Sequence, residues 1–255
     1  MRLPLPPLDM HAHVHPDISA RDLEALGAVI FAVTRSHNEA ELALARSDRA
    51  AVWGVGVHPG LVRAHRAFSV VQFAEQIERS PFVGEVGLDV ASRVDKRLQQ
   101  EHLEEILAIT RETPRIVSLH SYGATAALLE VLRRQPNVGA VLHWWLGDAA
   151  ETAEAIELGC YFSVNPSCAR DDWRVQLIPR DRLLTETDHP SGDRWTRGAA
   201  QPGNVTAVEL AFARTLGASR ADVREQVWAN FAELANRTKT VDALPKAVQT
   251  MLQSR

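Results

Sequence analysis

Residues 8–16 read LDMHAHVHP, a short apolar stretch that leads directly into three histidines at alternate positions. The first strand is expected over residues 5–10, with His11 and His13 at its end. Because alternate residues of a strand point to the same side, both rings can face inward together. An H-x-H pair in this position is a good two-nitrogen site for a metal, and a chance alternation of polar residues is the alternative interpretation. His15 has the same parity but lies beyond the strand, which favours a loop residue over a third ligand.

Outward from this stretch, the chain alternates short apolar runs with longer stretches of helical spacing. Eight runs are expected to form strands: Leu5–Met10, Ala28–Val33, Ala51–Val57, Phe82–Val86, Arg115–Leu119, Gly139–Leu142, Cys160–Val164 and Arg182–Thr185. Most are followed by an expected helix: Asn38–Arg46, Ser69–Arg79, Asp95–Arg111, Ala124–Arg134, Ala149–Leu158, Val205–Leu216, Ala221–Asn236 and Val241–Leu252. This order predicts an α/β protein whose residues 1–255 form a single (β/α)8 TIM barrel of the metal-dependent hydrolase type. An open doubly wound sheet is the main alternative, and the absence of G-x-G-x-x-G after the first strand counts against it.

Composition sets further limits. The 255 residues are 45% hydrophobic and 24% charged, as in ordinary globular proteins with a full core. The net charge of −4 provides no broad basic surface for a polyanion, although a bound metal can supply local positive charge. Cys160 and Cys168 are expected to be buried thiols in a reducing compartment. We see no signal region and no apolar run that could span a bilayer, so we expect a cytoplasmic protein without membrane contact.

Residue types that bind metals fall where the expected strands end, and in a parallel barrel these ends open on one face. Glu85, in VGEVGLD, ends the fourth strand, where a carboxylate must be coordinated or form a buried salt bridge. His120 and His143 end the fifth and sixth strands. One such histidine is usually structural, but two beside an H-x-H pair indicate ligands. Asp188 follows the eighth strand in LLTETDHP, and we favour it as the metal-side carboxylate, with Glu186 in a supporting role.

Together these residues supply enough donors for two divalent metal ions, Zn, Mn or Mg, with Glu85 bridging them. The six expected metal ligands are His11, His13, Glu85, His120, His143 and Asp188. Two metals can activate a water molecule and hold both the attacking and the leaving oxygen, and Asp188 can accept the proton of that water. The set therefore predicts metal-dependent hydrolysis of an ester, amide or phosphodiester, with Asp188 and Glu85 as catalytic residues. No G-x-S-x-G or Walker loop offers competing chemistry.

Other residues are candidates for binding the substrate. His58, in GVGVHPG, ends the third strand and faces the same mouth, where it holds a substrate oxygen or has a structural role. Trp144 and Trp145 can form a platform for stacking bases, but strand alternation would bury one of them. The loose loop after the eighth strand adds residues that contact phosphates or are simply solvated: Arg194, Trp195 and Arg197. Two further histidines, in helix or loop patterns, are expected to be structural or exposed: His65 and His102.

The order of these motifs resembles that of the TatD family of metal-dependent deoxyribonucleases, which are amidohydrolase-like barrels. DMHAHVHP is similar to the family's D-x-H-x-H, GVGVHP to G-x-H-P, VGEVGLD to G-E-x-G-L-D, LHSYGA to H-S, LHWWLG to H-C-F-x-G and LTETDHP to E-T-D-x-P. One short motif is a weak signal, whereas six in order at strand ends are a strong one. The resemblance implies one metal held by His11, His13, Glu85 and Asp188. It implies a second metal held by Glu85, His120 and His143.

Departures from the family pattern bear on the substrate. Tyr122 stands where the family's nucleases commonly have an arginine, a residue suited to phosphate, and it is a further candidate for substrate contact. Trp144, Trp145 and Leu146 replace an aromatic-plus-small segment, and Ala200 stands for the asparagine of the R-G-x-N-x-P loop. The segments LHWW, GCYFSVNP and IPRDRLLTETDHP are most similar to the TatD-type nuclease subunit of Qat anti-phage defence systems. That subgroup would imply protein partners encoded alongside.

The motifs therefore predict a nuclease that acts on DNA, with single strands or ends favoured. A narrow metal site at a barrel mouth admits a flexible strand more easily than the interior of a duplex. One alternative is a hydrolase of a non-DNA ester or amide, including misacylated tRNA, which the loss of arginine at Tyr122 favours. Another is a partner-binding subunit with a structural metal site. Salt dependence discriminates, because a chain held through several phosphates loses affinity steeply as salt rises.

Overall fold

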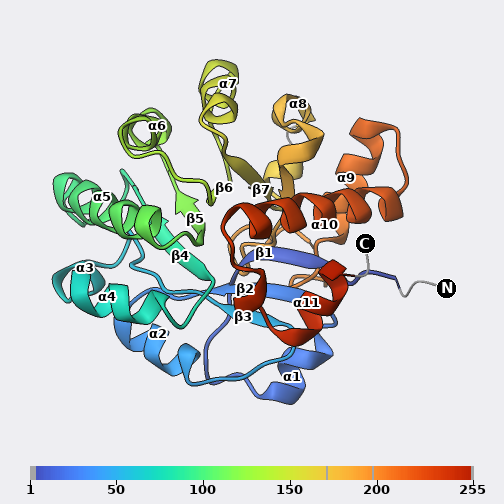
Figure 1. The fold of residues 1–255 in the computed structure, drawn as a ribbon. Helices are drawn as coiled ribbons and strands as arrows, with labels where there is room; N and C mark the ends of the chain where they lie inside the picture. The colour runs from blue at the N-terminus through green and yellow to red at the C-terminus, as the bar shows by residue number, and fades with distance from the viewer. Residues whose placement is uncertain (1–3, 171, 197, 254–255) are drawn as a thin grey trace.

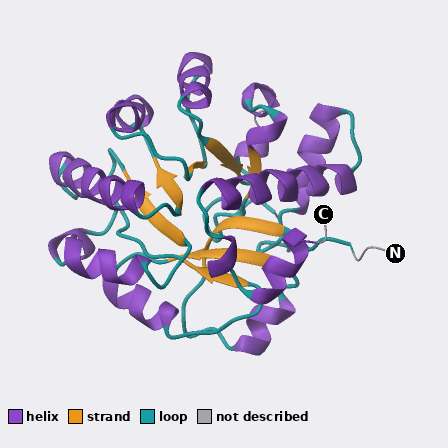
Figure 2. Ribbon diagram, viewed as in Figure 1, coloured by secondary structure: helices purple, strands orange, loops and turns teal. Residues whose placement is uncertain are grey.

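Eight parallel strands surrounded by helices make up the computed structural model, which describes residues 4–170, 172–196 and 198–253 (Figures 1 and 2). Strands β1–β3 pair in one sheet and β4–β8 in another, each strand lying beside the next in the chain. The strands are β1 (Leu8–His13), β2 (Val29–Val33), β3 (Ala51–Trp53), β4 (Phe82–Gly87), β5 (Ile116–His120), β6 (Ala140–His143), β7 (Tyr161–Val164) and β8 (Leu183–Thr185).

Two seams join these sheets into a barrel. Beyond the end of β3, Val55 forms a parallel bridge with Val83 of β4. At the other seam, the Asp188 amide, just after β8, donates to the His11 carbonyl of β1 at 2.8 Å. The predicted (β/α)8 barrel is therefore confirmed, and its second seam places Asp188 beside a histidine of the first strand.

The first strand differs from its expected bounds. It begins at Leu8 and runs through His13, instead of ending at Met10. The residues before it include three prolines, which have no amide hydrogen for a ladder, so they cannot extend the strand toward the N-terminus. The two histidines consequently lie within the strand and are held by its hydrogen bonds.

β1 also contains an irregularity just before these histidines. Residues 9–12 of β1 pair against only residues 30–32 of β2, so β1 carries one extra residue there. One inserted residue reverses which side chains point inward. Met10 therefore packs with the barrel's apolar interior, while His11 and His13 reach the cavity at the mouth or lie just beneath it.

β4 contains the same kind of irregularity, with one extra residue relative to its neighbour. Its residues 83–86 pair against only residues 117–119 of β5. Phe82, before the irregularity, lies in the apolar interior, and Glu85, within it, lines the cavity at the mouth. In both strands the extra residue lets one strand supply an apolar side chain to the core and a polar side chain to the mouth.

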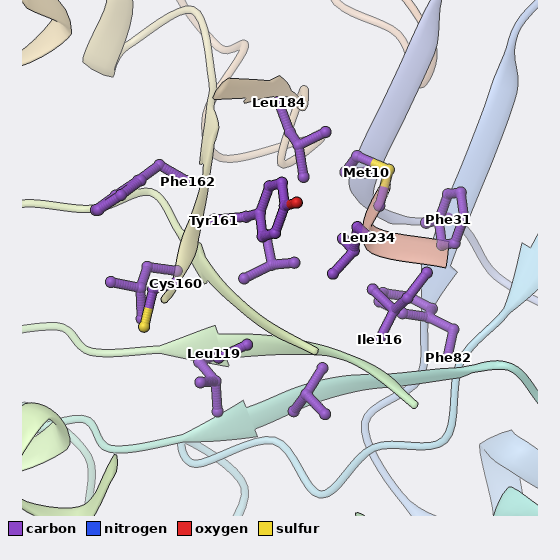
Figure 3. Packing of buried hydrophobic residues seen from close by; sticks show 14 of the residues in the cluster. Met10, Phe31, Phe82, Ile116, Leu119, Cys160, Tyr161, Phe162, Leu184 and Leu234 are labelled. Carbon is purple, nitrogen blue, oxygen red and sulfur yellow. The ribbon is translucent and has the colours of Figure 1, made fainter. Parts of the chain in front are cut away.

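Large apolar side chains fill the barrel towards the ends where the strands begin. Figure 3 shows Met10, Phe31, Phe82 and Tyr161 projecting into the space between the strands. The rings of Phe31 and Phe82 meet edge to face, with their centroids 5.1 Å apart. A closely packed interior is typical of such barrels and confines the chemistry to the mouth.

The helices follow the predicted pattern with a few differences. Those of the described residues are α1 (Ala20–Ala25), α2 (His37–Leu44), α3 (Val62–Arg66), α4 (Val70–Ile77), α5 (Lys96–Glu112), α6 (Thr125–Arg134), α7 (Ala149–Glu157), α8 (Asp172–Leu177), α9 (Thr206–Leu216), α10 (Arg220–Arg237) and α11 (Lys246–Gln253). α1, α3 and α8 were not predicted, because five or six residues give too short an apolar pattern to recognise. The last helix was predicted from Val241, but it starts only at Lys246. Pro245 cannot lie in a helix interior, and a 3-10 turn precedes it.

Two expectations about the chain's chemistry can be compared with the structure. Cys160 and Cys168 are buried and are not joined in a disulfide, as predicted. Among the described helices, none is both long enough and apolar enough to cross a bilayer.

A pair of histidines joins α3 to α5. The Nδ1 atoms of His65 and His102 lie 2.9 Å apart, so one ring donates its hydrogen to the other. The two rings are stacked with centroids 5.0 Å apart, and Phe68 packs 4.4 Å from the His102 ring. Burial, reinforced by the neighbouring His102, lowers the pKa of His65 to about 4. Both residues are structural, as the sequence indicated.

Because the pKa of His65 is lowered, the free energy of unfolding should fall in acid. The unfolded chain binds a proton at His65 below about pH 6.5, whereas the folded protein resists it until about pH 4. The stabilisation is thus complete above pH 6.5 and is lost as the pH falls, by up to about 3 kcal/mol. We expect His65→Gln to be less stable than wild type at pH 7.5, and the gap to shrink by that amount at pH 4.5.

Urea unfolding at both pH values measures these free energies. His15→Gln is the matched control, because the His15 side chain is 58% exposed. An equal gap between wild type and His65→Gln at the two pH values would contradict the assignment.

Candidate metal centre

A cavity of about 380 Å³ opens at the carboxyl ends of the strands. Its lining includes five of the six predicted metal ligands, and the sixth, His11, is completely buried. The lining residues are His13, His58, Glu85, His120, Ser121, Tyr122, His143, Trp144, Leu146, Asp188, Ser191 and Arg194. Strands β1, β4, β5 and β6 and the loop after β8 thus bring the predicted ligands to one place.

The first group of ligand atoms joins β1, β4 and the loop after β8. His13 Nε2 lies 3.3 Å from Glu85 Oε2 and 3.5 Å from Asp188 Oδ1. His11 Nε2 lies 3.7 Å from Asp188 Oδ1 and 3.9 Å from Glu85 Oε2. The other nitrogen of His11, Nδ1, is 2.7 Å from Ser118 Oγ, which fixes the ring with Nε2 toward the carboxylates.

The second group lies on β4, β5 and β6. His120 Nδ1 is 2.6 Å from Glu85 Oε1, and His143 Nε2 is 3.3 Å from the same oxygen. The two imidazole nitrogens are themselves 3.1 Å apart. Glu85 therefore directs Oε2 to the first group and Oε1 to the second, which is the arrangement of a bridging carboxylate.

These donors fit divalent metal ions. Ligand atoms lie within 4.8 Å of one another in three sets: His11 with His143 and Asp188, His11 with His13 and Glu85, and Glu85 with His120 and His143. Two of the atoms, His11 Nε2 and Glu85 Oε2, are buried without a hydrogen-bond partner. Buried polar atoms are rarely left unpaired, and a shared cation would satisfy both. Imidazole nitrogens with carboxylate oxygens suit zinc and manganese, and magnesium less well.

The pKa shifts of the buried ligands are mixed: nearby carboxylates outweigh burial and raise the pKa of His13, His120 and His143, whereas the pKa values of Glu85 and His11 are lowered. Burial raises the pKa of Glu85, but the surrounding imidazoles, His58 and His120 first, outweigh it and hold the pKa well below its usual value. Burial, together with the neighbouring His143, lowers the pKa of His11 well below its usual value. A charged carboxylate and a neutral imidazole are the forms that bind metals.

A carboxylate outside the two groups orients His143. Glu186 is completely buried, and its Oε1 lies 3.5 Å from His143 Nδ1, which turns Nε2 toward Glu85. It also accepts hydrogen bonds from the Trp144 amide, at 3.0 Å, and from the side chains of Asn165, at 3.2 Å, and Ser163. Carboxylates in this position fix the tautomer and direction of a metal-binding histidine. The predicted supporting position of Glu186 agrees with these contacts.

Two similar supports were missed by sequence reasoning. Asp89 Oδ2 lies 3.5 Å from His120 Nε2, and Ser118 contacts His11. Asp89 is the final residue of the VGEVGLD segment, and Ser118 precedes His120 by two positions, so it shares the inward side of β5. These positions in the sequence are the features from which the two supporting roles could have been predicted.

A third missed residue holds Asp188 in place. Asp9 is completely buried and accepts hydrogen bonds from the Thr187 amide at 2.8 Å, the Thr187 hydroxyl at 2.7 Å and the Gly203 amide at 2.7 Å. It thereby fixes the residue before Asp188, whose own backbone has a φ of 44°. Asp9 precedes His11 by two positions on β1, which is the one signal in the sequence for this role.

His58 lines the cavity, but its cavity-facing nitrogen carries a proton in the neutral ring and so cannot bind a metal. Its Nδ1 accepts the Gly60 amide at 2.8 Å, so in the neutral ring the proton is on Nε2. That Nε2 lies 3.2 Å from Glu85 Oε2 and lines the cavity. Glu85 Oε2 has no hydrogen-bond partner despite this approach, so the Nε2 hydrogen of His58 is available to a substrate oxygen, in agreement with the expected place of His58 at the mouth.

The structure separates the remaining substrate candidates. Tyr122, which is 54% exposed, and Trp144 both line the cavity. Trp145 was a wrong prediction: it is 2% exposed, and its indole nitrogen donates to Thr152 Oγ1 at 2.9 Å inside the protein. Trp145 lies beyond the end of β6, after the left-handed turn at Trp144 (φ 41°), and its ring is buried while that of Trp144 lines the cavity, so Trp145 cannot touch substrate. Arg197, also predicted to bind substrate, lies outside the described residues.

Comparison with known proteins gives the family. The profile of the family "TatD related DNase" matches residues 8–236. The chain is 29% identical over 205 residues to the metal-dependent hydrolase YjjV of Escherichia coli K12, covering 72% of this chain and 79% of that protein. It is 26% identical over 160 residues to deoxyribonuclease TATDN3 of Homo sapiens, covering 60% of this chain and 58% of that protein.

Solved structures agree on the fold. The crystal structure of YjjV superposes with a TM-score of 0.78 at 23% identity, covering 90% of this chain and 97% of that one. A TatD family hydrolase from Entamoeba histolytica gives a TM-score of 0.75 at 15% identity, covering 91% and 99%. The chain belongs to the TatD related DNase family of metal-dependent hydrolases and has the amidohydrolase-like (β/α)8 barrel of that family.

Proposed function

We propose that this chain hydrolyses phosphodiester bonds of DNA, in single strands or at ends, with two divalent metal ions. The observation that carries the proposal is the position of Glu85, whose two oxygens face two separate groups of ligand atoms. One ion would be held by His11, His13, Glu85 and Asp188, and the other by Glu85, His120 and His143. DNA as substrate is supported by the family profile and by the name of the human relative.

Each part of the site has a distinct task in this proposal. When bound, the metals supply an activated water and charge that stabilises the leaving oxygen. Asp188 is the proton acceptor, because its buried carboxylate lines the cavity 3.5 Å from His13 in the first ligand group; without metal, burial raises its pKa to about 7. His58 donates its Nε2 hydrogen toward a substrate oxygen in the cavity.

The size of the cavity supports a flexible substrate. About 380 Å³ is within the usual range of sites for small ligands, and the proposed ligands lie at its base. A nucleotide from a single strand or a frayed end can enter such a space, whereas a base pair inside a duplex cannot.

A second candidate is hydrolysis of a non-DNA ester or amide, including that of misacylated tRNA. One observation favours it: among the described residues that line the cavity, Arg194 is the one lysine or arginine. Tyr122 occupies the position where the resemblance implies an arginine. The third candidate, a partner-binding subunit with a structural metal site, would be supported by function that survives loss of Glu85 or Asp188.

A narrower proposal concerns partners. The resemblance of three segments to the TatD-type subunit of Qat anti-phage systems supports a place in a defence complex in the cytoplasm. Co-purification of proteins encoded beside this chain tests it, and a chain recovered alone, with full nuclease activity, would count against it.

The first test is cleavage of end-labelled single-stranded DNA with Mg²⁺, Mn²⁺ or Zn²⁺. We expect a metal-dependent ladder, and Asp188→Asn should slow it by roughly 10²–10⁴-fold, because the proton acceptor is lost. Asp17→Asn, at a side chain that is 80% exposed, is the control and should cleave normally. No cleavage with any metal, despite stoichiometric metal binding, would favour the non-DNA substrate or a required partner.

The proposed ligand sets make a prediction about metal content. His11→Ala combined with His13→Ala removes both imidazoles of the first group and leaves the second group intact. Elemental analysis of the dialysed protein should show the stoichiometry falling from two metals to one. A double variant that still holds two metals would contradict the first ligand set.

Glu186 provides a test of the second group. Glu186→Gln removes the charge beside His143 Nδ1 while keeping the size of the side chain, so metal affinity should fall by roughly 10–100-fold. Competition with a chromophoric chelator measures this affinity. Glu157→Gln, at an exposed position of α7, is the control. Equal affinities for the two variants would show that Glu186 does not orient a metal ligand.

A further inference from the structure

Three side chains at one edge of the cavity form a cluster that the metal centre does not use. The guanidinium carbon of Arg194 lies 5.7 Å from the ring centroid of Trp144 and 5.4 Å from that of Trp195. Trp144 and Arg194 line the cavity, and Trp195 is 61% exposed. We name Trp144, Arg194 and Trp195 the aromatic clamp. Two tryptophan rings that flank one arginine at a cavity offer stacking surfaces beside a positive charge.

The loop that carries Arg194 and Trp195 is held firmly. Arg194 Nη1 donates to the Ser191 carbonyl at 2.9 Å. Asp193 is 1% exposed, and its Oδ2 lies 2.8 Å from His189 Nδ1. The Asp193 carbonyl also accepts the Thr196 amide at 2.8 Å. These contacts restrain the loop around Arg194 and Trp195, and a restrained loop loses less entropy on binding.

Trp144 is fixed from the opposite side. Its backbone has a φ of 41°, a conformation that side-chain-bearing residues seldom adopt, and its amide donates to buried Glu186. This contact directs Trp144 to the mouth while Trp145 is buried. The same carboxylate that orients His143 therefore also sets one wall of the clamp, so the clamp has a fixed position relative to the metal centre.

The charge around the cavity decides which ligand fits. Arg194 is the one lysine or arginine among the described lining residues, and its positive charge lies between two aromatic rings. A polyanion gripped through many phosphates needs several such cations. A single cation with open aromatic faces instead suits one phosphate with one planar base, since bases stack on tryptophan regardless of sequence.

We propose that the aromatic clamp binds one unpaired nucleotide beside the bond that is cut. Its base stacks on the exposed ring of Trp195, and its phosphate contacts Arg194. This inference rests on the proposed function and extends it, because a base inside a duplex is already stacked and paired and cannot occupy the clamp. The clamp would therefore select single strands and frayed ends.

Binding of a fluorescein-labelled pentathymidylate, followed by fluorescence anisotropy, tests the proposal. The Asp188→Asn background with Mn²⁺ prevents turnover. Trp195→Ala should weaken binding by roughly 5–100-fold, the range for loss of one stacked base. Arg194→Met should lower the slope of log affinity against log salt by about 0.7, because one phosphate contact is lost.

Trp173→Ala is the matched control. Trp173 is 47% exposed and has its own arginine, Arg174, 4.4 Å from its ring centroid, but it does not line the cavity. We expect it to bind the oligonucleotide like the background protein. Equal affinity in Trp195→Ala and Trp173→Ala would overturn the clamp.

An abasic scan locates the stacked base. Each thymine is removed in turn, and one position should reproduce the loss seen in Trp195→Ala. At that position the Trp195→Ala variant should lose nothing further, because both changes remove the same contact. Additive losses at every position would overturn the proposal, and so would a blunt duplex of equal length that binds as tightly as the single strand.

Cleavage of the same oligonucleotide by protein with native Asp188 separates this inference from the proposed function. Binding that depends on Trp195 without any cleavage would support the clamp and contradict DNA hydrolysis by this chain alone. Cleavage whose KM is unchanged by Trp195→Ala would support DNA hydrolysis and overturn the clamp.

Discussion

The buried carboxylate of Glu85 is the constraint on which the mouth of this barrel depends. Five imidazole rings have a nitrogen within 3.9 Å of its two oxygens. An isolated charge at such a position would be strongly destabilising, and it is compatible with folding only if cations or protons are shared around it. The surrounding residues serve that condition: Ser118, Asp89 and Glu186 turn histidine rings toward Glu85, and Asp9 holds the loop that brings Asp188 close.

Much of the fold and of this centre was predictable from the sequence. The alternation of apolar runs and helical stretches gave the barrel, and histidines or carboxylates at strand ends gave the ligand positions, since parallel strands end on one face. Residues that act through a ligand were harder to find, because Ser118 and Asp89 belong to types that are common everywhere. Their supporting roles can be recognised only from their contacts with His11 and His120 in the structure.

The errors have physical causes of the same kind. The extra residues in β1 and β4 cannot be recognised from composition. In β1 the extra residue lets the side chains of Met10 and His11, although adjacent, both point into the barrel. Trp144 and Trp145 lie beyond the end of β6, and the apolar pattern does not report the left-handed turn at Trp144 that sends their rings in different directions. The short helices and the displaced start of α11 follow from local backbone rules that an apolar pattern does not report.

The seam between β8 and β1 has a consequence for the order of assembly during synthesis. Glu85, His120 and His143 lie on three consecutive strands of one sheet, so they can meet once β6 has left the ribosome, before β7 and β8 are made. His11 and His13 are made first, but they must wait for Asp188, and Asp9 must wait for Gly203. The residues of the second ligand group can therefore come together before barrel closure, which completes the first group. Contacts between residues so distant in sequence are the slow ones to form. A chain released before the last strand would contain every residue of the second ligand group and would lack Asp188 of the first.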